Sequence, residues 1–222
     1  MYDDNSLWGV AGMEGWNSDV VAVIDDDRAV RDSLQWLLES GGLQIRAFAT
    51  AQDFLAALEG GHRPGAALVD VRLPGMSGLD LQQRLNEMGL CLPVVIITGH
   101  GDVPVAVRAM KAGAVDFIEK PFNDQVLLDR VQEALEQGHR LRQEEADLQA
   151  IMQRIERLTP REREVMELVV QGWLNKQIAA ELGLSPKTVE VHRAHVMEKM
   201  EADSLARLVR MAVSLEMVQD QR

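Results

Sequence analysis

Residues 20–27 read Val-Val-Ala-Val-Ile-Asp-Asp-Asp, and this stretch decides the fold. The first five residues are apolar and mostly β-branched, which is typical of a strand buried on both faces of a parallel sheet. Three carboxylates, Asp25, Asp26 and Asp27, follow directly. We therefore expect a central strand that ends in an acidic loop.

Strand-like and helix-like patterns alternate from this stretch to about residue 135. Short apolar runs predict further strands over 45–48, 66–69, 93–97 and 115–118. Apolar residues at helical spacing predict helices over 30–38, 54–58, 79–85, 105–112 and 126–135. This alternation predicts an α/β doubly wound, five-stranded parallel sheet, because right-handed crossovers make the strands parallel.

Polar residues lie at the carboxyl ends of the predicted strands, where the functional residues of such sheets are found. They are Asp25, Asp26, Asp70, Thr98 and Lys120. Converging carboxylates suit Mg²⁺, which would offset their mutual repulsion. An ionised Asp70 would then be a nucleophile toward a phosphoryl donor, with Thr98 and Lys120 on the phosphoryl oxygens. The Lys120-Pro121 bond allows a cis peptide that would aim the lysine.

Asp27 has two interpretations that the residues leave open. It is either a further metal carboxylate or a first-turn carboxylate that the helix dipole favours.

Four segments resemble the receiver domain of two-component signalling, at 23–27, 68–78, 96–101 and 116–122. The resemblance covers residues 19–138. It implies that Asp70 is the phosphoacceptor, that Asp25 and Asp26 hold the metal with Asp70, and that Lys120 contacts the phosphoryl group. It also implies that Thr98 is the switch hydroxyl and Phe117 the switch aromatic.

The chain on either side of this region has a different character. Residues 1–18 show no periodicity and are expected to be an N-terminal tail. Residues 139–157 are expected to form a helical linker. Leu141, Leu148 and Ile155 are spaced by heptads, so this helix is either a short coiled coil or a solvated connection. Whether it continues the last receiver helix is left open.

Residues 158–222 are predicted to form an all-α, four-helix domain with a helix-turn-helix. Thr159-Pro160-Arg161-Glu162 is a capping box with proline at the first helical position, and Ser185-Pro186 repeats the cap-then-proline start. We expect Asn175 to cap the helix between them.

The segments 158–165, 172–179, 184–192 and 199–200 resemble the LuxR-type DNA-binding domain. Together with the receiver, they resemble a response regulator of the FixJ/NarL class. The sequence Thr-Val-Glu-Val-His-Arg-Ala at 188–194 and the loop at 100–104 favour the FixJ branch of that class.

A helical wheel indicates which side of the third helix would meet DNA. With Val189, Val196 and Met200 in the core, Glu190 is placed to accept from cytosine, and Val191 and Ala194 to touch a thymine methyl. Basic side chains would hold phosphates. The alternative is a solvated polar face. The expected DNA-binding residues are Asn175, Lys176, Lys187, Thr188, Glu190, Val191, His192, Arg193, Ala194, His195 and Lys199.

Net charge argues against a strongly basic DNA-binding protein. The chain carries −12 in total, of which residues 1–157 hold −11 and residues 158–222 only −1. The helix over 185–200 gives only a weak positive field, because three basic residues face three acids: Lys187, Arg193 and Lys199 against Glu190, Glu198 and Glu201 just beyond it. We therefore predict weak monomer binding and a dimer on a two-fold site.

Composition bounds the setting of the protein. Cys91 is the only cysteine, which excludes an internal disulfide and favours a reducing compartment. The longest apolar run, over 90–97, is too short to span a bilayer, and the N-terminus does not resemble a secretory signal. We expect a cytoplasmic protein without a membrane partner.

The resemblance implies a transcriptional response regulator and not an enzyme. A sensor histidine kinase would phosphorylate Asp70, and a homodimer through a face that includes Lys111 and Val115 would bind promoter DNA and meet RNA polymerase. One alternative is constitutive DNA binding, with the receiver as an interaction module. A Mg²⁺-dependent phosphatase is disfavoured, because Arg72 stands where such enzymes place a second acid.

Overall fold

The computed structural model describes residues 19–99 and 103–219. The chain divides into two compact units, with the boundary after Leu141. The expected tail at 1–18, and most of the loop at 100–104, lie outside the described residues.

In the described part of the first unit, five strands form one parallel sheet in the order β2-β1-β3-β4-β5. The chain order reverses between β1 and β3, so their carboxyl ends flank the crevice where α/β sheets place their sites. The doubly wound prediction is confirmed, with strand ends within one residue of those expected. The strands are β1 (Val20–Ile24), β2 (Gln44–Phe48), β3 (Ala66–Asp70), β4 (Val94–Thr98) and β5 (Asp116–Glu119).

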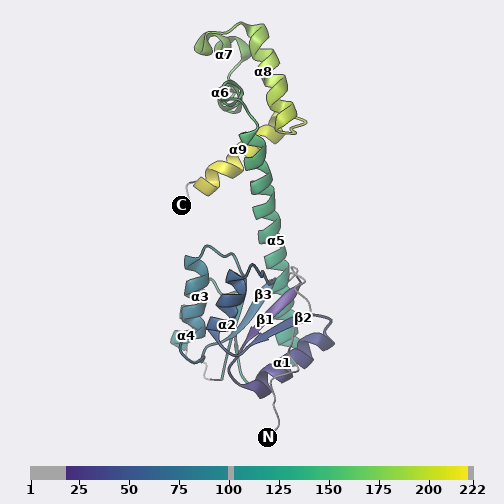
Figure 1. The fold of residues 1–222 in the computed structure, drawn as a ribbon, viewed down its shortest axis with the longest axis vertical. Coiled ribbons are helices and arrows are strands. Elements are labelled where there is room, and N and C mark those ends of the chain that lie inside the picture. Colours follow the sequence, from purple (N-terminus) through teal and green to yellow (C-terminus); the bar gives the residue numbers. More distant parts are fainter. Residues whose placement is uncertain (1–18, 100–102, 220–222) are drawn as a thin grey trace. The chain divides into compact units, whose positions relative to one another are not determined.

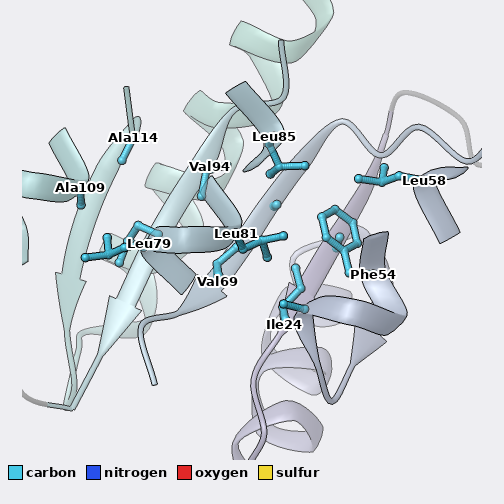
Figure 2. Close-up of a cluster of buried hydrophobic side chains, with 14 residues drawn as sticks. Ile24, Phe54, Leu58, Val69, Leu79, Leu81, Leu85, Val94, Ala109 and Ala114 are labelled. Carbon is cyan, nitrogen blue, oxygen red and sulfur yellow. The ribbon is translucent and has the colours of Figure 1, made fainter. Parts of the chain in front are cut away.

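Side chains of the central strands alternate between two apolar layers. One layer joins the sheet to α2, α3 and α4, and the other joins it to α1 and the first half of α5 (Figure 1). Figure 2 shows the first layer, in which Phe54 of α2 and Leu81 of α3 are fully buried. The helices are α1 (Arg28–Ser40), α2 (Ala51–Glu59), α3 (Gly78–Glu87), α4 (Val103–Lys111) and α5 (Asp124–Glu156).

Helix α5 runs without interruption through the predicted linker. Gly138 lies inside it, at the position where the receiver was expected to end. Farther along, Ile151 and Ile155 pack into the apolar core of the second unit. Ile155, the last residue of the heptad pattern, therefore packs within the second unit.

The second unit holds α6 (Pro160–Val170), α7 (Asn175–Leu182), α8 (Pro186–Lys199) and α9 (Leu205–Gln219). Thr159 forms the predicted capping box with Glu162, and the hydroxyl of Ser185 caps α8. The prediction for Asn175 is wrong, because this residue is the first of α7 rather than its cap. The backbone N–H of Leu174 is satisfied instead by Gln177 Oε1, at 2.8 Å.

Among the described residues, none of the helices combines the length and the apolar character that crossing a bilayer requires.

Candidate phosphoacceptor pocket and nucleic-acid interface

Three charged side chains meet at the carboxyl edge of the sheet. Asp25 follows β1, Asp70 ends β3, and Lys120 follows β5. The Lys120 ammonium donates to Asp25 Oδ2 at 2.7 Å and to Asp70 Oδ1 at 2.8 Å. A cis peptide joins Lys120 to Pro121. Residues far apart in sequence thus meet in one charged cluster, as their places at strand ends predicted.

Backbone groups hold the remaining carboxylate oxygens. Asp25 Oδ1 accepts the N–H of Asp27 at 2.9 Å, and Asp70 Oδ2 accepts the N–H of Arg72 at 2.6 Å. The guanidinium of Arg31 donates to the carbonyl of Asp25 at 2.6 Å. Both carboxylates are therefore held in one orientation before any ligand arrives.

Burial and charge oppose each other in this pocket. Asp25 is 1% exposed, and burial raises its pKa even though hydrogen bonds from Lys120 and Asp27 act in the opposite direction. Burial alone would lower the pKa of Lys120, but its bonds to Asp25 and Asp70 outweigh this effect, and the net shift is upward. The lysine is therefore a firmly charged partner for an anion.

The other predicted pocket residues occupy different surroundings. Asp26 is exposed at the start of the acidic loop. Thr98 is buried at the end of β4, and its carbonyl accepts the N–H of Lys120 at 2.7 Å. Phe117 is half-buried against the apolar layer under α2, α3 and α4.

Asp27 is a helix cap. Its Oδ1 accepts the N–H of Ala29 at 2.8 Å and that of Val30 at 3.4 Å at the start of α1. Of the two interpretations that the sequence left open, the structure favours the one at the helix N-terminus.

The donor chemistry of the pocket fits a hard divalent cation. Two carboxylates, Asp25 and Asp70, converge from neighbouring strands, and Mg²⁺ prefers such oxygens. Within residues 19–99 and 103–219, however, no group of three or more His, Cys, Asp or Glu side chains is assembled as a metal site. The Lys120 ammonium bridges the two carboxylates in this arrangement.

Gly78 is a pocket residue whose role the sequence reasoning missed. A Cβ atom at this position would lie 2.1 Å from the carbonyl oxygen of Asp70 and 2.9 Å from Cγ1 of Val69. Helix α3 therefore packs against the backbone of Asp70 only because its first residue has no side chain. A glycine at the start of a helix was the available signal.

Helix α8 has the orientation that the wheel predicted. Val189, Val196 and Met200 are buried, and Val191 and Ala194 on the other side are exposed. Of the expected DNA-binding residues, those exposed are Lys176, Lys187, Glu190, Val191, Ala194 and His195. Those half-buried are Asn175, Thr188, His192, Arg193 and Lys199.

Contacts within the protein occupy some of these polar groups. Arg193 donates to Asn175 Oδ1 at 2.8 Å, which ties α8 to the start of α7. The hydroxyl of Thr188 lies 2.8 Å from that of Ser185. Lys187 lies 3.8 Å from Glu190 in an exposed pair, which costs little to open.

Glu162 is a second residue whose role the sequence reasoning missed. It is 3% exposed on α6, and it accepts the ammonium of Lys199 at 2.6 Å and the N–H of Thr159 at 2.8 Å. His195 Nδ1 lies 3.4 Å away. The hydrogen bonds from Lys199 and Thr159 lower the pKa of Glu162 to about 2. Its place in the capping box was visible, but its contact with α8 was not.

The expected dimer-face residues lie at the end of α4 and just beyond it. Lys111 is exposed, and Val115 is half-buried against the layer under α1 and α5. Apolar side chains Val103, Val107 and Met110 form an exposed stripe along α4.

Two families account for both units. Residues 21–132 match the response regulator receiver domain, and residues 156–212 match the luxR family of bacterial regulatory proteins. The chain belongs to the response regulators that carry a LuxR-type DNA-binding domain.

Individual relatives lie in the FixJ branch. The chain is 48% identical over 200 residues to the transcriptional regulatory protein FixJ of Bradyrhizobium diazoefficiens, covering 90% of this chain and 97% of that protein. It is 52% identical over 197 residues to FixJ of Azorhizobium caulinodans, covering 87% and 91%. Among solved structures, the response regulator StyR matches with a TM-score of 0.77 and 42% identity, covering 87% and 97%.

Proposed function

We propose that the protein is a transcription regulator gated by phosphorylation, in which a sensor histidine kinase transfers a phosphoryl group to Asp70. The observation that carries the proposal is the convergence of Asp25, Asp70 and Lys120 at the switch point of the sheet. The relatives named FixJ support the same class of function.

In the proposed reaction, a carboxylate oxygen of Asp70 attacks phosphorus. A P–O bond forms to Asp70 as the P–N bond of the phosphohistidine breaks. Lys120 exchanges its bond to Asp70 Oδ1 for a bond to a phosphoryl oxygen. Asp25 and Asp26 would hold Mg²⁺ with Asp70, and the ion would neutralise charge as the phosphoryl group arrives. The Thr98 hydroxyl then donates to the phosphoryl group.

The response spreads along the sheet edge. Thr98 ends β4, and Phe117 lies in β5 beside it. Movement of Thr98 toward the phosphoryl oxygens leaves room into which Phe117 turns. These changes alter the α4–β5 face at Lys111 and Val115, and two receivers pair through it. The phosphoryl group favours the paired state, because its contacts with the protein are complete only in that state.

Promoter DNA is bound by the second unit as a dimer. The exposed cations Lys176 and Lys187 hold phosphates, and Glu190, Val191 and Ala194 of α8 read bases. Arg193 contributes both a phosphate contact and the tie to Asn175. Lys199 acts mainly through Glu162, because its ammonium is already held there. The bound dimer would meet RNA polymerase at the promoter.

The test is the intact mass after incubation with Mg²⁺ and acetyl phosphate, followed by sedimentation. Wild type should gain one phosphoryl group and dimerise, and Asp70→Asn should do neither. Asp53→Asn is a matched control, because Asp53 is an exposed first-turn carboxylate of α2 outside the pocket. Equal dimerisation of wild type and Asp70→Asn would refute the gating mechanism and favour constitutive DNA binding.

A further inference from the structure

Gln82 is a buried amide in an apolar layer. It lies on α3, is 2% exposed, and bonds to Ala109, a member of the cluster that joins α2, α3 and α4 to the sheet. Figure 2 shows this cluster, with Ala109 of α4 at one side. A buried amide needs hydrogen-bond partners at both ends, or it destabilises the packing around it.

The partners of Gln82 are poor. Its Nε2 donates to the carbonyl of Ala109 at 3.3 Å, and this oxygen already accepts the N–H groups of Ala112 and Ala114, each at 3.1 Å. Its Oε1 is buried without a hydrogen-bond partner among the described residues. Turning the amide over would place the acceptor Oε1 against the carbonyl oxygen of Ala109, where no hydrogen bond can form, so one long bond is the most that this arrangement provides.

Among the described residues, α4 contributes mainly Ala109 and the half-buried Val105 to the apolar cluster. Its fully buried residue is the small Ala109, whereas the larger Val103, Val107 and Met110 face outward with 75, 45 and 47% exposure. Asn86 of α3 donates to the carbonyl of Ala112 at 2.8 Å just after α4, and this contact is exposed. The buried contact between α3 and α4 thus includes a polar group that the contact does not satisfy.

We infer that Gln82 weakens the resting α3–α4 packing so that α4 can move when Asp70 is phosphorylated. In the displaced arrangement, the amide reaches hydrogen-bond partners that it lacks at rest. The unsatisfied amide thereby raises the free energy of the resting state and reduces the free-energy difference between the resting and the dimerising state. The inference rests on the proposed function, because it assigns the moving element of that switch.

The experiment uses the full chain and the variant Gln82→Met, which keeps the length of the side chain and removes its polar ends. Gln83→Met is the matched control, because Gln83 is exposed on the same helix and its side chain donates to Glu87 of that helix at 3.0 Å. Dimer dissociation constants are measured by sedimentation with and without beryllofluoride, a mimic of the phosphoryl group. Gln82→Met should weaken the beryllofluoride-bound dimer by about tenfold, and Gln83→Met should not.

Hydrogen exchange of α4 amides in the unmodified protein is a second readout that does not depend on dimerisation. It should slow by about tenfold in Gln82→Met, because the resting packing becomes more stable. Unchanged or faster exchange would overturn the inference. A beryllofluoride-bound dimer of Gln82→Met that is as tight as the wild-type dimer, or tighter, would also overturn it, and a tighter dimer would show that Gln82 stabilises the resting packing. If wild type fails to dimerise with beryllofluoride, the proposed function fails, and the exchange result still decides the role of Gln82. Gln82→Leu provides a second apolar variant if the methionine packs poorly.

Discussion

The ammonium of Lys199 on α8 lies 2.6 Å from the buried carboxylate of Glu162 on α6. The same carboxylate accepts the N–H of Thr159 that opens α6. The Glu162 side chain therefore joins the start of α6 to the end of α8.

Glu162→Gln should destabilise the second unit. The change removes the ion pair with Lys199 and leaves the Lys199 ammonium against a neutral amide. The free energy of unfolding should fall by about 2 kcal/mol. Urea unfolding followed by circular dichroism would measure it. Glu164→Gln is the control, because Glu164 is exposed on the same helix and pairs with Arg161 of that helix. Equal effects of the two substitutions would contradict a special role for Glu162.

Acid should destabilise the second unit through the same residue. The pKa of Glu162 falls from 4.5 to about 2 on folding, so its contribution is complete above pH 4.5 and is lost as the pH falls toward 2. Thermal unfolding between pH 5 and pH 2 should show a steeper loss of stability in wild type than in Glu162→Gln. Parallel profiles would show that other carboxylates dominate.

Gly78→Ala should impair the acid pocket. The new methyl group would lie 2.1 Å from the carbonyl of Asp70, so α3 must shift and the receiver should lose about 2 kcal/mol of stability. Phosphorylation of Asp70 by acetyl phosphate should slow, as followed by intact mass. Gly99→Ala is the control for stability, because its Cβ would meet nothing within 4 Å. A normal phosphorylation rate in Gly78→Ala would show that the close packing has no role in the pocket.

Lys176→Ala and Lys199→Ala should separate phosphate contact from positioning. Lys176 is exposed on α7, so its loss should remove one phosphate contact. The slope of log affinity against log salt should become less steep by about 1, and the unfolding midpoint should stay unchanged. Lys199 is held by Glu162, so its loss should lower the unfolding midpoint instead. Fluorescence anisotropy on promoter DNA across a salt series, together with urea unfolding, measures both. A change of midpoint in Lys176→Ala would argue against an exposed phosphate contact.

Local sequence signals were enough to predict the strands of the sheet, with each strand end within one residue. The uninterrupted run at Val20–Ile24 predicted its strand residue for residue, and the cap-then-proline starts at Thr159 and Ser185 placed two helices. These signals are local, because side-chain periodicity and capping act within one or two turns. Parallel strands also bring their carboxyl ends to one edge, so the meeting of Asp25, Asp70 and Lys120 followed from the strand assignments.

Only the tertiary structure decided which polar groups find partners. Asn175 could cap a helix on local grounds, but the packing of α8 against α7 gives its oxygen to Arg193. Glu162 and Gln82 both lie on ordinary helices, and their burial depends on helices that are distant in sequence. The continuity of α5 through Gly138 was equally undetermined, because a glycine inside a helix costs only about 1 kcal/mol, which packing on both sides can offset. Satisfaction of a buried group is a property of the whole packed unit, and no short stretch of sequence specifies it.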